Sequence, residues 1–104
     1  MVYDLRPMVE PTNDPILYSL REQISNADRD LVAAFVRRLE AAAEVRSHKD
    51  ERGYAFVDPE RERELLAHWQ EAAAGAVSDD ALRELFETVL SLSKREAGRY
   101  ETPS

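Results

Sequence analysis

The stretch LYSLREQISNADRDLVAAFVRRLEAAAEVRSHK, residues 17–49, decides the fold of this chain. Its apolar residues recur at steps of three and four, a spacing that places side chains on one face of an α-helix. The residues of this apolar stripe are Leu17, Leu20, Ile24, Ala27, Leu31, Phe35, Ala42 and Val45. Neither glycine nor proline interrupts the pattern before Gly53, so the sequence predicts one helix from about Pro15 to Arg52.

Two cationic residues lie on the same stripe. Arg38 continues the spacing between Phe35 and Ala42, and Lys49 continues it after Val45. A cation that points into a core costs several kcal/mol unless an anionic group meets it there. Either both side chains extend along apolar surface to reach water, or the fold holds a site for an anion.

The length of the predicted helix has a consequence for assembly. A helix over residues 15–52 is about 60 Å long, at ~1.5 Å rise per residue. A compact monomer of this size has a radius of gyration of only about 13 Å, so the rest of the chain cannot surround such a helix. We therefore expect an intertwined homodimer, in which two long helices pack along each other.

The composition predicts an all-α domain and narrows the classes of partner. The 104 residues are about the size of one domain, and they are rich in Ala, Leu, Glu and Arg with only 3 Gly. The 21 Asp and Glu residues outnumber the 14 Lys and Arg residues, which argues against nucleic acid or an anionic membrane as partner. The absence of cysteine, of a membrane-spanning run and of a signal peptide predicts a cytoplasmic location.

Three segments are expected along the chain. Residues 1–13 contain two prolines and no periodicity, which predicts an irregular N-terminal arm. Residues 14–98 form the helical domain, which ends near Gly98, and residues 99–104 form a C-terminal tail.

Local signals predict three helices in this domain. The residues that cap or open them are Asn13 or Asp14 with Pro15 for the first, Asp58 with Pro59 for the second, and Ser78 for the third. The apolar stripe of the second helix is Leu65, Leu66, Trp69, Ala72 and Ala73, and that of the third is Leu82, Leu85, Phe86, Val89 and Leu90.

Both shorter helices also carry polar residues on these inner faces. Stepping back one turn from Leu66 reaches Glu62, and stepping on from Val89 reaches Ser93 and then Ala97. A carboxylate and a hydroxyl therefore share the predicted interior with the two cations of the first helix.

These residues predict a small polar cavity for a dianionic ligand. Glu62 can neutralise one of Arg38 and Lys49 but not both, and Arg21 flanks the first stripe as a further cation. Arginine recognises a carboxylate through two parallel hydrogen bonds, and lysine supplies a compact point charge. We therefore expect a compact dianionic ligand.

Other chemistries have little support in this sequence. The two histidines, His48 and His68, are too few and too scattered for a metal site, and we expect them at the surface. There is no glycine-rich phosphate loop and no local pairing of a nucleophile with a base. We expect neither a metal nor another cofactor.

The sequence resembles the all-helical (type II) chorismate mutases. The matching segments are LREQI at 20–24, DRDL at 28–31, RRL at 37–39, Lys49 and DPERE at 58–62. The resemblance extends over about residues 15–97. It implies an intertwined dimer of three-helix chains that rearranges chorismate, a cyclic dicarboxylate, to prephenate, in the shikimate pathway and aromatic amino acid biosynthesis.

The resemblance also implies a role for each site residue. Arg38 would hold one carboxylate of the substrate with help from Ser93. Arg21 of the partner subunit would hold the other carboxylate together with Lys49. The residues implied as catalytic are Arg38, Lys49 and Glu62.

The ring side of the implied site contains a departure from the family. Lys49 would face the ether oxygen, and Glu62 and Asp58 would meet the ring hydroxyl, although Asp58 is equally well explained as a helix cap. The family usually has Gln or Glu one turn after Ser93 as a second donor to the ether oxygen, but this chain has Ala97 there. Loss of one such donor can cost on the order of 10²–10³ in rate. The departure therefore predicts a slow mutase, a local distortion that lets the adjacent Glu96 act instead, or a relative of chorismate as the substrate.

Three alternatives remain at the level of sequence. Two are enzymes of the same family, a 4-amino-4-deoxychorismate mutase or an isochorismate pyruvate-lyase of a secondary-metabolite pathway. Glu62 alone would favour the amino substrate, because a carboxylate attracts an ammonium. The third is a catalytically weak helical dimer with a binding or regulatory role, which Ala97 favours.

Overall fold

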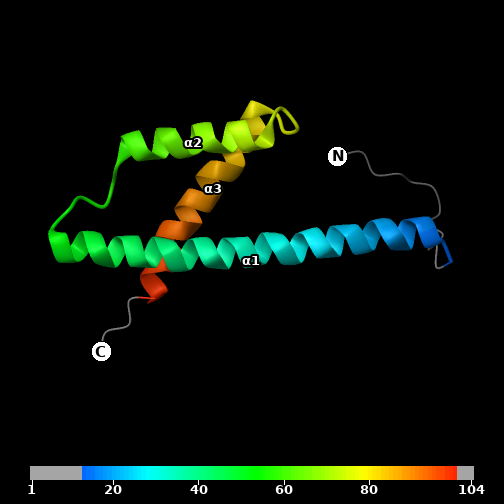
Figure 1. The fold of residues 1–104 in the computed structure, drawn as a ribbon, viewed down its shortest axis with the longest axis horizontal. Coiled ribbons are helices and arrows are strands. Elements are labelled where there is room, and N and C mark those ends of the chain that lie inside the picture. The colour runs from blue at the N-terminus through cyan, green and yellow to red at the C-terminus, as the bar shows by residue number, and fades with distance from the viewer. Residues whose placement is uncertain (1–12, 101–104) are drawn as a thin grey trace, which may run out of the picture. The chain divides into compact units, whose positions relative to one another are not determined.

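The computed structural model describes residues 13–100, and the secondary structure in them is entirely helical (Figure 1). The elements are α1 (Pro15–Arg52), α2 (Pro59–Ala73), α3 (Asp79–Ala97) and a short 3₁₀ helix, η1 (Gly98–Tyr100). The predicted all-α chain with a very long first helix is therefore confirmed. No helix in these residues combines the length and the apolar character needed to cross a membrane. Most of the predicted arm, residues 1–12, and residues 101–104 of the predicted tail lie outside the described residues.

Side-chain caps start the helices at the residues predicted from the sequence. The Asp14 carboxylate accepts hydrogen bonds from the backbone N–H groups of Ile16 and Leu17, at 3.0 and 3.1 Å. The caps of the other two helices are Asp58, which accepts from the Arg61 N–H at 3.2 Å, and Ser78, which accepts from the Ala81 N–H at 3.3 Å. Each cap satisfies backbone donors that the first turn of a helix leaves unpaired.

The helix ends differ in their backbone conformation. Gly53 follows α1 with a φ of 71°, a left-handed conformation that glycine adopts without a steric penalty. Two residues, Ala74 and Gly75, are left-handed after α2. Gly98 ends α3 as predicted but keeps a right-handed φ of -62°, so the chain continues directly into η1.

The chain divides into two structural units between Ala34 and Phe35. In the first unit, six large apolar side chains of α1 are exposed to solvent. These side chains are Ile16, Tyr18, Leu20, Ile24, Leu31 and Val32, and the least exposed of them, Leu20, is 50% accessible. Of the apolar stripe predicted from the sequence, Leu20, Ile24 and Leu31 are therefore uncovered in this unit.

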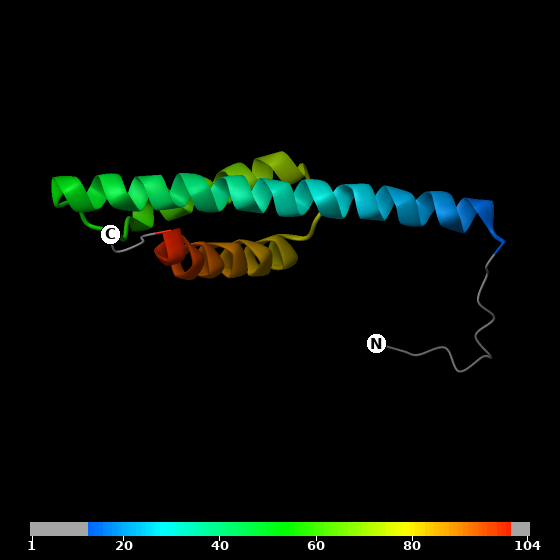
Figure 2. The same ribbon diagram turned by 90° about the horizontal axis from the view of Figure 1, so that it is seen from below.

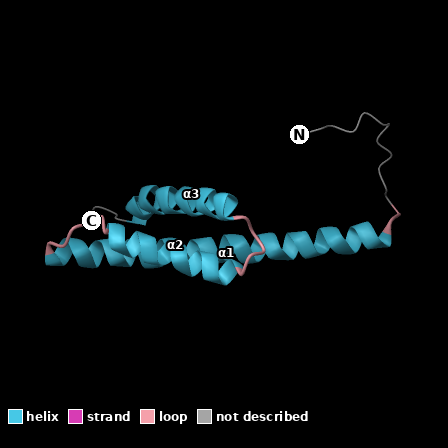
Figure 3. Cartoon of the chain, turned by 90° about the horizontal axis from the view of Figure 1, so that it is seen from above, coloured by secondary structure: helices cyan, strands magenta, loops and turns pink. Residues whose placement is uncertain are grey.

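The second unit consists of the C-terminal part of α1, α2, α3 and η1. The connection between α1 and α2 reverses the chain, so that α2 runs back along residues 35–52 of α1 (Figure 1). Viewed along the layers, this part of α1 and α2 lie at one level and α3 lies at another (Figures 2 and 3). Segments from all three helices thereby surround a common interior.

The core of the second unit is small and aromatic. Phe86 and Leu82 of α3 are buried, and the rings of Phe86 and Trp69 meet edge to face with centroids 5.3 Å apart. Leu39 is the buried residue of α1. Leu85 was predicted on the inner face of the third helix, but it is 50% exposed, so that part of the prediction is wrong within this chain.

Candidate active site

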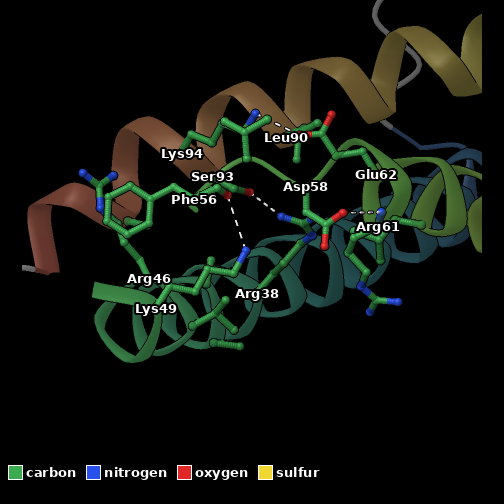
Figure 4. Close-up of a pocket in the computed structure, with 16 residues that line it drawn as sticks. Arg38, Arg46, Lys49, Phe56, Asp58, Arg61, Glu62, Leu90, Ser93 and Lys94 are labelled. Carbon is green, nitrogen blue, oxygen red and sulfur yellow. Dashed lines mark hydrogen bonds and ion pairs between the residues drawn. The ribbon is translucent and has the colours of Figure 1, made fainter. Parts of the chain in front are cut away.

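A cavity of about 460 Å³ lies within the second unit (Figure 4). Its walls come from α1, the connection between α1 and α2, α2 and α3, and its size is in the usual range for small-molecule sites. Of the six residues predicted for the site, the five that line this cavity are Arg38, Lys49, Asp58, Glu62 and Ser93. The sixth, Arg21, belongs to the first unit, is exposed, and does not line the cavity.

Arg38 is held in place by a buried hydroxyl. Its Nη1 donates a hydrogen bond of 2.5 Å to Ser93 Oγ, and Ser93 Oγ donates one of 2.6 Å to the Val89 carbonyl one turn back along α3. Burial lowers the pKa of the Arg38 guanidinium below its usual range, since desolvation disfavours the charged form. The guanidinium nevertheless stays protonated at neutral pH, and an anion in the cavity would restore part of the solvation that it has lost.

Lys49 reaches the cavity from the last turn of α1. Its Nζ lies 3.4 Å from the backbone carbonyl oxygen of Phe56, to which it donates a hydrogen bond. The Phe56 ring lies below the Arg46 guanidinium, with the guanidinium carbon 5.2 Å from the ring centroid, a cation–π arrangement. Two cations of α1 thus hold the connection to α2 against the cavity.

The two carboxylates of the cavity already have partners within the chain. Asp58 caps α2, which confirms its predicted role as a helix cap. It also lines the cavity. The Glu62 carboxylate accepts a hydrogen bond of 3.1 Å from the ammonium of Lys94, which projects from α3 (Figure 4). This ion pair connects helices whose participating residues lie 32 positions apart in the sequence.

Ala97 lines the cavity, and its methyl group is almost completely buried. The neighbouring Glu96 does not line the cavity; its carboxylate forms an ion pair of 3.0 Å with Arg99. The wall at this position therefore offers no side-chain donor from either residue.

Positive charge exceeds negative charge around the cavity. The five cationic lining residues are Arg38, Arg46, Lys49, Arg61 and Lys94, against two carboxylates, Asp58 and Glu62. The Arg61 guanidinium is paired with Glu64, which does not line the cavity, and Lys94 is paired with Glu62, so the excess comes from the three cations of α1. In a chain with a net charge of -7, this excess is confined to one place and suits an anionic ligand. Residues 13–100 contain no group of three or more His, Cys, Asp or Glu side chains that could hold a metal ion.

Three of these cations, Arg46, Arg61 and Lys94, were not predicted as site residues, although helical spacing could have found them. Arg61 lies four residues before Leu65 of the α2 stripe. Arg46 lies four residues after Ala42 and three before Lys49, so it belongs to the same face of α1. Lys94 lies four residues after Leu90, which continues the stripe of α3.

The fold and the site define the class of this protein. It is an all-helical chain with a cavity whose cationic lining suits a small anionic ligand. The family described as chorismate mutase type II matches residues 20–97. This chain therefore belongs to the chorismate mutase type II family.

Two curated relatives agree with this assignment. The T-protein of Enterobacter agglomerans is 36% identical over 75 residues, which cover 71% of this chain and 20% of the relative. The T-protein of Haemophilus influenzae is 37% identical over 82 residues, 78% of this chain and 21% of the relative. The chain thus spans about a fifth of the length of the curated relatives it matches. No solved structure matches it significantly.

Proposed function

We propose that this protein is a chorismate mutase, which rearranges chorismate to prephenate. The observation that carries the proposal is the grouping of Arg38, Lys49, Glu62 and Ser93 around one cavity, in a chain of the chorismate mutase type II family. The substrate is a cyclic dicarboxylate, and the excess of cations around the cavity matches its two negative charges.

The reaction makes limited demands on the protein. One C–O bond of the ether breaks while one C–C bond forms, and the electrons move within the substrate without a nucleophile or an external proton. The protein must hold the substrate in its folded reactive conformer and direct donors at the ether oxygen, which gains negative charge as its bond breaks. Cationic side chains on rigid helices perform both tasks.

Each side chain then has a defined role. Arg38, already fixed by its hydrogen bond to Ser93, binds one carboxylate of the substrate. Lys49 turns its ammonium from the Phe56 carbonyl, a long hydrogen bond of 3.4 Å, to the ether oxygen and the second carboxylate. Glu62 and Asp58 meet the ring hydroxyl at the α2 side of the cavity.

The active form in this proposal is a homodimer, with Arg21 of the partner subunit completing the grip on the second carboxylate. Its support is the exposed apolar stripe in the first unit, where side chains such as Ile24 and Leu31 are more than 60% accessible. Such a continuous apolar face on one helix is typical of a surface that another chain covers. Arg21 lies beside this stripe, next to Leu20.

The proposal is tested by incubating the purified protein separately with chorismate, 4-amino-4-deoxychorismate and isochorismate. We expect chorismate to be consumed fastest, with prephenate identified as the product by NMR. Faster consumption of isochorismate with release of pyruvate would assign the chain to lyase chemistry instead.

Thermal unfolding with and without chorismate provides an independent readout. A ligand that binds only the folded state raises the melting temperature as its concentration increases. If none of the three compounds is consumed and none raises the melting temperature, the enzymatic proposal is wrong and a binding or regulatory dimer replaces it.

A further inference from the structure

The Lys94–Glu62 ion pair changes the chemistry of the cavity at its α2 side. The two residues come from different helices, and both line the cavity. The Glu62 side chain is 32% exposed and that of Lys94 is 55% exposed, so the carboxylate is the more enclosed partner. Lys94 follows Ser93, which anchors Arg38, and both residues line the same cavity as the proposed substrate site.

Both carboxylates of the cavity already have a partner within the chain, and that of Glu62 is a cation. Glu62 is neutralised by Lys94 at 3.1 Å. Asp58 accepts from the Arg61 N–H at the start of α2, where the positive end of the helix dipole offsets part of its charge. The remaining charged groups that line the cavity are all cationic.

We infer that Lys94 determines substrate specificity, by selecting a neutral hydroxyl over an ammonium as the ring substituent that meets Glu62. This inference rests on the proposed function and deepens it. A hydroxyl can donate to the Glu62 carboxylate and accept from the Lys94 ammonium, so it can lie beside the pair and bond to both partners without breaking their contact. An ammonium has donors but no acceptor, so it competes with Lys94 for Glu62 and faces a like charge.

The ion pair reverses the expectation from the sequence. Taken alone, Glu62 favours the 4-amino substrate, because a carboxylate attracts an ammonium. Paired with Lys94, the same carboxylate presents a site with no net charge, which favours chorismate and its ring hydroxyl.

The test replaces Lys94 with a neutral side chain of similar length. We expect the wild-type protein to have a higher kcat/KM for chorismate than for 4-amino-4-deoxychorismate. In Lys94→Met, we expect the ratio of the two kcat/KM values to fall by about tenfold, mainly through a lower KM for the amino substrate.

Two control variants separate charge from other effects of substitution. Lys94→Arg keeps a cation beside Glu62 and should retain most of the wild-type ratio. Arg99→Met removes a cation from an exposed ion pair with Glu96, a residue that does not line the cavity, and should leave the ratio unchanged.

The possible failures of the two proposals differ. The role of Lys94 is overturned if Lys94→Met turns over both substrates with an unchanged ratio of kcat/KM values. It is also overturned if the wild type prefers the amino substrate. Both results leave the mutase proposal standing. An equal loss of turnover on both substrates also overturns this role, because Lys94 would then be a general donor. If neither substrate is turned over, the dissociation constants of the two substrates, measured by calorimetry, are compared in place of the kcat/KM values. If neither binds, the proposed function fails and this inference fails with it.

Discussion

In residues 15–34 of α1, most of the large apolar side chains are exposed, whereas in residues 35–100 polar side chains such as Ser93 and Arg38 are partly or fully enclosed. Both arrangements are unfavourable for an isolated chain, since water contacts apolar surface in one and a cation loses solvation in the other. The second region also exposes apolar side chains, such as Leu85 and Val57, but only there is a cation partly buried, so the first region calls for an apolar partner and the second for an anion as well. A second copy of the chain and a dicarboxylate substrate would supply them.

The largest effect is expected from Lys49→Ala in the second region. Removing the donor that faces the ether oxygen should lower kcat by about 10²–10³ or more, while the KM for chorismate changes much less. Steady-state kinetics on chorismate measure both quantities. Arg52→Ala is the matched control, because Arg52 is one turn further along α1, is exposed and does not line the cavity. Nearly wild-type kcat in Lys49→Ala would remove Lys49 from the mechanism.

The next effect concerns the apolar region. Leu31→Asp places a charge on the exposed stripe, and burying it at a dimer interface without a partner should raise the dimer dissociation constant by about 10². Sedimentation equilibrium on the wild type and the variant measures this constant.

Asn26→Asp is the control for Leu31→Asp. It adds a charge to the opposite face of the same helical segment, where the asparagine already accepts from Arg29 within the helix. We expect the wild type and Asn26→Asp to remain dimers. A wild-type protein that is monomeric at micromolar concentration would contradict the proposed use of the stripe.

A moderate gain is expected from Ala97→Gln. This change restores a donor on the wall of the cavity, at the position where the family usually has Gln or Glu, and kcat should rise by about tenfold. Ala97→Met fills the same volume without a donor and should not increase kcat. An equal response of the two variants would mean that packing rather than donation limits the rate.

The smallest effect is expected from Ser93→Ala. Arg38 loses its acceptor on α3, so the free energy of unfolding should fall by about 1 kcal/mol, as measured by urea denaturation. Chorismate should also bind more weakly, because the guanidinium is no longer fixed in direction. Ser91→Ala, at an exposed position of the same helix, should change neither quantity appreciably. An unchanged affinity in Ser93→Ala would indicate that Arg38 is positioned by other contacts.

The helix boundaries could be predicted well because their causes are local. Asp14, Asp58 and Ser78 each cap the helix that begins after them, and Gly53 ends α1. Capping depends on backbone groups two or three residues away, so the sequence contains all the relevant partners. The placement of Ser93 on an inner face follows equally from helical spacing.

Burial was harder to predict than position. The same spacing placed Leu31, Leu85 and Phe86 on apolar stripes, but only Phe86 is buried in this chain. Whether a stripe is covered depends on which element lies across from it, and Trp69 of α2 covers Phe86. Spacing along one helix carries no information about that second element.

By itself, the sequence determined the three helices, the family, and the presence of cations, a carboxylate and a hydroxyl on inward faces. These properties depend on periodicity and on capping residues within a few positions of each other. The pairing of Lys94 with Glu62, 32 positions apart in the sequence, depends instead on how α2 and α3 pack against each other. Side-chain partners from distant segments depend on how the helices pack, and here that packing changes the expected preference from an ammonium to a hydroxyl.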